Sequence, residues 1–182
     1  MRMAAPVYYT AEMVRNLPDD GNRYEVVHGE LLVTPAPRLW HQKLVTRMSG
    51  ALEVYLESEP VGEVLASPAD ISWGRDVLVQ PDVFVVPCEE ARALKWSGIR
   101  TVLLAVEVLS PASHRADRFT KRRLYQERHV PVYWMFDGEQ RLVEVWTPES
   151  DFPAVERDVL RWHPADATRP FELALGRFFR PI

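Results

Sequence analysis

The sequence predicts one α/β (α+β) domain in which a central mixed β-sheet is flanked by helices. Three observations indicate this fold class. The chain has 182 residues, 47% of them hydrophobic, which suits a single domain of roughly 150 residues with short extensions. Helical periodicity occurs in two long segments, 39–56 and 110–128, and short β-rich runs lie between and after them. We expect an N-terminal helical extension over 1–22, a core over 23–147, and C-terminal strands with a short helix over 148–182.

The N-terminal part predicts a short helix followed by a hairpin. Residues 10–17 have helical character and end at Pro18 and the turn formed by residues 19–21. Two β-rich runs then surround His28-Gly29 over 23–33, a pattern typical of a β-hairpin.

The middle of the chain predicts one long helix and several strands. Apolar residues over 39–56 recur at steps of three, four and seven residues, which indicates an amphipathic helix. Short apolar runs over 61–73, 77–79 and 83–86 predict successive strands, and residues 89–95 a helical turn.

The longest apolar run, 101–109, predicts a strand buried on both faces. Ser110-Pro111 predicts the start of a second helix that reaches about residue 128, because a hydroxyl cap and a proline favour a helix N-terminus. Strands are expected at 130–136 and 141–146, with more short strands and an amphipathic end over 155–182.

Composition excludes several classes of protein. The single cysteine, Cys88, rules out a disulfide framework and favours a reducing compartment. No apolar run is long enough for a membrane-spanning helix, and the first residues lack the apolar stretch of a signal peptide, so we expect a cytoplasmic protein. A net charge of -4 argues against a protein that coats nucleic acid through bulk positive charge. The same net charge is compatible with a locally basic site.

Two acidic residues stand out among apolar strands. Glu107 lies inside the most apolar run, where an ionised carboxylate is costly unless a cation compensates it. Asp82 follows Pro81 between two apolar runs, and two carboxylates from neighbouring strands suit Mg²⁺. The alternatives are a strand-end Glu107 that faces solvent or pairs with Arg100 or Arg123, and an ordinary Pro-Asp turn at Asp82.

The second long helix places Asp117, Lys121, Leu124, Tyr125 and Arg128 on one face. A lysine on the inner side of this helix would reach a metal-bound water or a phosphate oxygen, whereas the alternative is a solvated basic face. Zinc sites of ordinary spacing and the common nucleotide-binding and hydrolase motifs are not found in the sequence.

His41 lies near the start of the first long helix, where free backbone N–H groups favour anions. A phosphate-facing role and a surface or capping role are equally compatible with this position.

Several strings of the sequence together resemble a known family. They include Tyr24 to Leu31, His41, Gln80-Pro81-Asp82-Val83, Val106 to Pro111, Asp117 to Lys121, Tyr125, and Val130-Pro131-Val132-Tyr133-Trp134. In this order they are similar to the Uma-type putative restriction endonucleases of the PD-(D/E)XK nuclease superfamily, over about residues 24–146. The resemblance implies a restriction-endonuclease-like fold with the active site at one end of the sheet.

The resemblance also implies the active-site residues. Asp82 and Glu107 would be the two acids that hold Mg²⁺ or Mn²⁺, with the main-chain carbonyl of Val108 as a further ligand. The superfamily lysine usually stands two residues after the second acid, but this chain has Leu109 there, and Lys121 is the expected replacement. These residues would carry out metal-assisted phosphodiester hydrolysis, in which Lys121 orients water or stabilises charge on phosphorus.

Second-shell or phosphate-contacting roles are implied for His41 and Glu30. Glu30 would alternatively be a third metal ligand or an exposed strand residue.

The implied partner is DNA, in double-stranded form, with Arg38, Lys43, Arg118 and Arg122 as contacts to its phosphates. We also expect a homodimer or higher homo-oligomer, because a symmetric pair of basic helices suits a duplex. The frequent aromatic residues near the C-terminus suit an oligomer interface, although the tryptophans are equally compatible with a core.

Two other functions are compatible with the sequence: a catalytically silent nuclease-fold module that binds DNA or protein, and a metal-dependent hydrolase of small phosphate esters. Convergence of Asp82, Glu107 and Lys121 would favour catalysis, and dispersal of these residues would exclude it.

Overall fold

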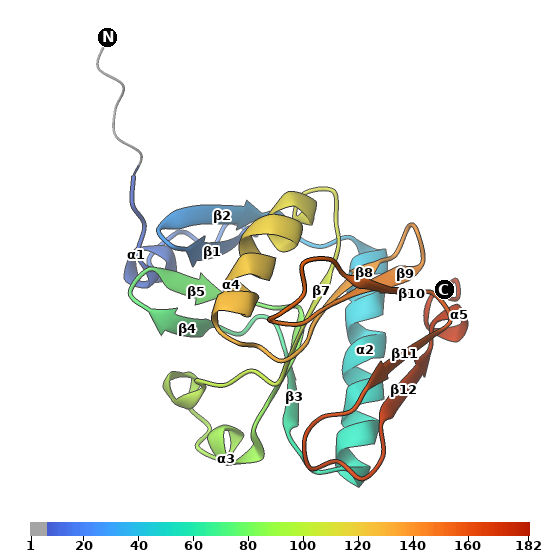
Figure 1. The fold of residues 1–182 in the computed structure, drawn as a ribbon. Helices are drawn as coiled ribbons and strands as arrows, with labels where there is room; N and C mark the ends of the chain where they lie inside the picture. Colours follow the sequence, from blue (N-terminus) through green and yellow to red (C-terminus); the bar gives the residue numbers. More distant parts are fainter. Residues whose placement is uncertain (1–6) are drawn as a thin grey trace.

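The computed structural model describes residues 7–182, so the first six residues of the predicted extension lie outside the described residues. It confirms the mixed α/β fold, in which helices cover a large mixed sheet (Figure 1). The helices are α1 (Ala11–Arg15), α2 (Leu39–Ser58), α3 (Cys88–Ala91), η1 (Trp96–Gly98), η2 (Ala116–Lys121), α4 (Arg122–Glu127) and α5 (Leu175–Phe178). None of the helices over residues 7–182 is long and apolar enough to cross a membrane.

The strands form three sheets within the described residues. A six-stranded sheet has the order β10-β9-β8-β7-β6-β3, a four-stranded sheet the order β2-β1-β5-β4, and β11 pairs with β12. The strands are β1 (Arg23–Val27), β2 (Glu30–Thr34), β3 (Glu63–Ala66), β4 (Ile71–Gly74), β5 (Val77–Val79), β6 (Val83–Val86), β7 (Leu104–Val108), β8 (Tyr133–Asp137), β9 (Leu142–Trp146), β10 (Ala154–Glu156), β11 (Val159–Trp162) and β12 (Phe171–Ala174).

Strand β7 is central in the six-stranded sheet. It runs parallel to β8 and antiparallel to β6, and all of its residues are buried. Leu104, Val106 and Val108 contribute to the hydrophobic core on one face, while Ala105 contributes to the core on the other. The prediction of a strand buried on both faces is therefore confirmed.

Helix α2 covers one face of the six-stranded sheet (Figure 1). Its buried residues Leu44, Met48 and Leu52 belong to the same core cluster as Trp134 of β8, as the helical spacing of the sequence predicts. The C-terminal hairpin β11–β12 and α5 lie along this helix and complete that cluster.

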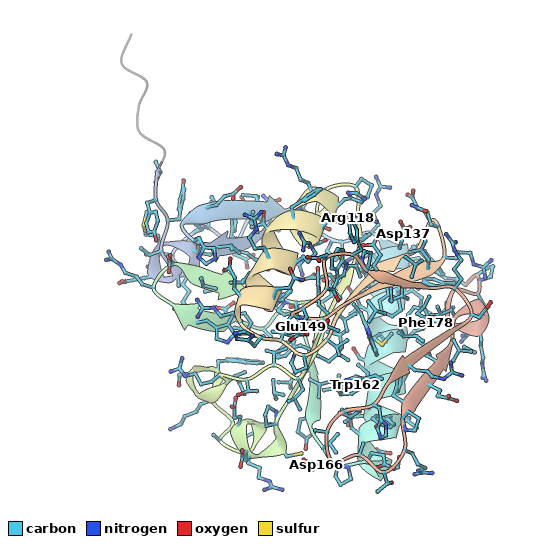
Figure 2. All side chains as sticks on the ribbon, in the orientation of Figure 1. Arg118, Asp137, Glu149, Trp162, Asp166 and Phe178 are labelled. Atoms are coloured by element: carbon cyan, nitrogen blue, oxygen red, sulfur yellow. The ribbon has the colours of Figure 1, made fainter. Side chains whose placement is uncertain are left out.

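The aromatic residues near the C-terminus are part of this core. Trp162, Phe171, Phe178 and Phe179 are all buried, and Figure 2 labels Trp162 and Phe178 in this C-terminal layer. Their rings pack within one chain, so they belong to the core and do not indicate an oligomer interface. The oligomeric state itself stays a prediction.

The other face of the sheet packs against α4 and the four-stranded sheet. Leu124 and Tyr125 of α4 join Val27 and Val79 of that sheet in a second core cluster. Helix α1 closes the far side, where Val14 packs with Val26 and Leu78. The N-terminal helix is thus built into the domain.

The β1–β2 hairpin turns at His28 and Gly29, which have φ angles of 50° and 82°. Two consecutive positive φ angles are typical of the tight turn that suits the twist of a hairpin. A Cβ atom at Gly29 would collide with the ring of Tyr8, so this position requires glycine for space as well as for conformation.

The second long helix is capped at Ser110 as predicted and differs from its prediction in its middle. Ser110 Oγ accepts a hydrogen bond from Ser113 N at 3.1 Å, and helical hydrogen bonding begins with His114 N to Ser110 O. Ser110 therefore has the hydrogen bonds of a helix N-cap, and Pro111 follows it at the first position, as predicted. Residues 116–121 then form a π-helical turn before α4.

Candidate active site

Glu107 lies on β7 and is fully buried. Lys121 Nζ is 2.9 Å from its Oε1, and Tyr125 donates a hydrogen bond to the same oxygen at 3.2 Å. Arg100 and Arg123 are both exposed, so the alternative that pairs Glu107 with one of them is wrong. Glu107 is a buried, compensated carboxylate.

Asp82 lies immediately before β6, beside the end of β7. The pairing of Val83 with Val106 brings Asp82 next to Glu107 on the neighbouring strand. Asp82 Oδ2 accepts a hydrogen bond from Val108 N at 2.8 Å, and its exposed fraction is only 4%. The Asp82 carboxylate is therefore built into the sheet, and the alternative of an ordinary exposed turn is excluded.

Two basic side chains also hold Asp82. Arg23 Nη1 lies 2.8 Å from Asp82 Oδ1, and His41 Nε2 lies 3.1 Å from Oδ2. Burial opposes ionisation of Asp82, but His41 and the positive charge of Arg23 outweigh it and hold the pKa of this carboxyl well below its usual range. Asp82 is thus ionised at neutral pH.

Glu25 on β1 is a member of the site that the sequence analysis did not identify. It is fully buried, its Oε2 lies 2.9 Å from Lys121 Nζ, and its Oε1 accepts a hydrogen bond from Gln80 N at 2.7 Å. Its signal in the sequence is weaker than that of Glu107, because β1 also contains Arg23 and only Val26 and Val27 follow Glu25 as an apolar run.

Glu30, the hairpin residue named as a candidate, is exposed at the turn end of β2, opposite Val27. Over residues 7–182 it forms no ion pair with the site. Glu25, on the other strand of the hairpin, occupies the place that was expected for Glu30.

Lys121 connects the acidic residues. Its side chain is 1% exposed, and its Nζ lies 2.9 Å from both Glu25 and Glu107 and 3.5 Å from Asp117 Oδ1. Burial alone would favour the neutral amine, but these three carboxylates raise its pKa, so Lys121 is charged. The predicted inner face of the helix is confirmed for Lys121 and its buried neighbours, whereas Arg128 is exposed.

The buried cluster is short of positive charge. Four carboxylates (Glu25, Asp82, Glu107 and Asp117) surround two permanently charged cations, Arg23 and Lys121. When all four acids are ionised, Arg23 and Lys121 balance two of them, and His41 contacts one more, Asp82. Burial raises the pKa of Glu107 and of Asp117 in spite of the nearby Lys121 ammonium. The cluster thus takes up protons or another cation.

A divalent cation fits this cluster in charge and in donor chemistry. Its donors are carboxylate oxygens, the ligands that Mg²⁺ and Mn²⁺ prefer. Glu107 Oε2 is buried without a hydrogen-bond partner and is available as a ligand. Over residues 7–182, no three acidic, histidine or cysteine side chains are preassembled around one metal position. Binding would therefore have to replace part of the ion pairing by Lys121 and Arg23.

A pocket of about 690 Å³ leads from the surface to Asp82. Arg38, His41 and Gln80 line it together with Asp82, whereas Glu107 and Lys121 lie deeper in the protein. The pocket brings together two of the predicted phosphate-contacting residues, Arg38 and His41, beside one acid of the cluster.

The other predicted DNA contacts lie elsewhere. Lys43 is exposed on α2, outside the pocket lining. Arg118 forms an ion pair with Glu144, and its Nη2 lies 3.9 Å from Asp137; Figure 2 labels Arg118 and Asp137 close together.

Arg122 lies over the ring of Trp146 at 4.6 Å and donates a hydrogen bond to Gln126 Oε1 at 2.8 Å. Protein partners therefore hold both Arg118 and Arg122, and contact between these residues and DNA stays a prediction.

The model of the Uma2 family, described as "Putative restriction endonuclease", matches residues 11–175. The chain belongs to this family. Among curated proteins, no relative matches the sequence. A solved structure with the same fold is that of "a putative nuclease belonging to DUF820" from Anabaena variabilis ATCC 29413, with a TM-score of 0.73 and 19% sequence identity. The alignment covers 94% of this chain and 97% of that one.

Membership of the Uma2 family supports a nuclease function, and the restriction-endonuclease-like fold expected from the sequence is confirmed. The family match spans every acidic residue of the cluster and Lys121. The cluster of Glu25, Asp82, Glu107 and Lys121 is therefore the candidate active site of this Uma2 chain.

Proposed function

We propose that this protein is a metal-dependent endonuclease that hydrolyses phosphodiester bonds of DNA with Mg²⁺ or Mn²⁺. The observation that carries the proposal is the convergence of Asp82, Glu107 and Lys121 in one buried cluster whose carboxylates outnumber its arginine and lysine side chains, so that the cluster is short of positive charge. A divalent cation supplies that charge. A module without catalytic function would have no need to keep this costly set of buried charges together.

Asp82 and Glu107 would hold the metal, with the carbonyl of Val108 as a further ligand and Glu25 as a third acid within reach of Lys121. When bound, the metal polarises a phosphate oxygen and lowers the pKa of a coordinated water. Arg23 and His41 keep Asp82 ionised and oriented for this role.

Lys121 would serve as the cationic group of the reaction. Its charged ammonium donates hydrogen bonds and would orient the attacking water or stabilise negative charge that develops on the phosphate. Leu109 stands where the superfamily lysine usually lies. In this chain Lys121 reaches Glu107 of β7 from the neighbouring helix η2, so the site has an ammonium group without a lysine at position 109.

The pocket would admit the substrate backbone. Arg38, at the N-cap of α2, is exposed on the pocket lining and would neutralise a phosphate there. Lys43, Arg118 and Arg122 are further proposed contacts for double-stranded DNA. A homodimer would double this basic surface. Sedimentation velocity with and without duplex DNA would test both the binding of DNA and the association of two copies of the chain.

The deciding experiment measures metal binding and cleavage together. Mn²⁺ and Mg²⁺ are titrated calorimetrically into wild type, Asp82→Asn, Glu107→Gln and the charge-matched control Glu53→Gln, an exposed residue of α2. Plasmid nicking is followed for the same proteins. We expect saturable binding and metal-dependent nicking in wild type and the control, and loss of both in the two cluster variants.

Two results would contradict the proposal. Full nicking activity in Asp82→Asn or Glu107→Gln would show that the substituted carboxylate is not needed to hold the metal. Absence of both metal binding and nicking in wild type would leave a nuclease fold that serves as a binding module.

A further inference from the structure

Lys121 has three carboxylate neighbours, and the third has no role in the reaction proposed above. Glu25 and Glu107 lie 2.9 Å from Nζ, while Asp117 Oδ1 lies 3.5 Å away. The longer distance makes Asp117 the weakest partner in the metal-free protein.

Asp117 is nevertheless held firmly in place. It is fully buried, its N–H donates to Ser113 O at 2.9 Å, and its carbonyl accepts a hydrogen bond from Tyr133 at 3.2 Å. Both of its carboxylate oxygens are buried without a hydrogen-bond partner over residues 7–182. A buried carboxylate with unused acceptor capacity is costly, which argues that another state of the protein uses it.

The π-helical turn aligns this carboxylate with Lys121. Asp117 and Lys121 are four residues apart within η2, and Tyr125 follows four residues later on α4. The extra residue of a π-turn rotates the residues before it relative to the following α-helix, and such turns are frequent at functional sites. All three side chains are buried on the side of the cluster.

We propose that Asp117 is a positioning residue that holds Lys121 when a divalent cation binds to Glu107. This inference rests on the proposed function. A cation held by Glu107 would repel the ammonium, and an unpaired ammonium would be costly at a site where Lys121 is 1% exposed. Asp117 lies on the same helix as Lys121 and accepts the ammonium after a small movement of one side chain. Lys121 therefore stays charged and beside the metal.

A double-mutant cycle tests this exchange of partners through metal affinity. Mn²⁺ affinity is measured by calorimetry for wild type, Asp117→Asn, Lys121→Met and the double variant. If Asp117 retains Lys121, then Asp117→Asn leaves the ammonium competing for Glu107, and Mn²⁺ affinity falls by about tenfold. In the Lys121→Met background the same change should have an effect at least about threefold smaller, because no ammonium competes.

Two results overturn the inference in distinguishable ways. Equal effects of Asp117→Asn in both backgrounds would mean that Asp117 acts on the metal directly, which leaves the proposed function intact. Absence of metal binding in wild type would remove the proposed function and this inference together.

A second measurement uses the wild-type protein and does not depend on whether Asp117→Asn folds. NMR of ¹⁵N-lysine-labelled protein follows the Nζ resonance of Lys121, assigned by its loss in Lys121→Met. Addition of Mg²⁺ should shift this resonance while its ammonium protons remain protected from exchange with water. Loss of protection would show that Lys121 is released to solvent, which would overturn the inference.

Discussion

The ammonium of Lys121 lies 2.9 Å from a carboxylate oxygen of Glu25, so a buried ion pair connects η2 with strand β1 of the four-stranded sheet. The same ammonium contacts Glu107 in the six-stranded sheet. One side chain thus connects both large sheets at the candidate active site, and the site forms only when the two sheets have come together.

Glu25 should matter more than Glu30 for metal binding. Glu25→Gln removes one buried charge from the cluster, so we expect Mn²⁺ affinity to fall by about tenfold and nicking to slow. Glu30 is exposed, and Glu30→Gln should change both by less. Calorimetry and nicking assays on the two variants provide the comparison. A larger loss of Mn²⁺ affinity in Glu30→Gln than in Glu25→Gln would show that Glu30 is the acid of the site.

Lys121→Met should separate binding from chemistry. Methionine fills much of the space of the lysine stem but carries no charge, so competition for Glu107 disappears and Mn²⁺ affinity should be retained or increased. The rate of cleavage at saturating metal should fall by about 100-fold or more. Single-turnover kinetics would measure this loss. Loss of metal binding in this variant would show that Lys121 has a different role.

Glu107 should make the metal-free protein less stable as the pH rises. Burial raises the folded-state pKa of Glu107 above its ordinary value of 4.5. The folded protein therefore retains a proton that the unfolded chain releases, and this contribution to stability is lost as pH rises from about 4.5 through the folded pKa. Urea unfolding with EDTA at several pH values should show a shallower decline in Glu107→Gln. An identical decline in both proteins would contradict the expectation.

Glu59 should show the opposite pH dependence. Its carboxylate accepts hydrogen bonds from Thr168 N at 2.7 Å and from Arg169 Nε at 3.0 Å, which tie the segment before β12 to the end of α2. These hydrogen bonds, led by those from Thr168, lower its pKa to about 2. The stabilisation is present above the ordinary value of 4.5 and is lost as the pH falls through about 2.

Glu59→Gln should therefore be less stable than wild type at neutral pH, and the two proteins should converge as the pH approaches 2. Acid unfolding monitored by circular dichroism would measure the difference. A constant difference over the whole pH range would mean that the side chain acts through packing alone.

Most elements of the fold were predictable from local pattern. The spacing of apolar residues in α2, the continuous apolar run of β7 and the His28-Gly29 turn each identify one element. The π-turn at 116–121 was not predictable, since it depends on tertiary contacts such as the burial of Lys121 among acids. The cap of the second helix was predictable, because Ser110 is followed by a proline and its hydroxyl group accepts a hydrogen bond from Ser113 N.

Asp82 and Glu107 stand out in the sequence as carboxylates in apolar surroundings, whereas Lys121 was selected by the resemblance to the Uma-type family. The structure brings the three side chains into one cluster, and their roles in metal binding and catalysis stay predictions. The choice of Glu30 in place of Glu25 was less successful. Both glutamates lie on the same face of one hairpin, because Glu30 is opposite Val27, two residues after Glu25. They differ in their position along the hairpin: Glu30 is next to the exposed turn, whereas Glu25 lies further into the strand. The burial of Glu25 comes from its contacts with Lys121 and Gln80, which are long-range contacts.

Three proline-containing segments line the pocket above Asp82, and they contribute Pro35, Pro37, Pro68 and Pro111. Each proline ring fixes one backbone dihedral angle, so these walls have little conformational freedom to lose when a ligand enters. The entropic cost of ordering the pocket on binding is correspondingly small, and more of the contact energy is expressed as affinity.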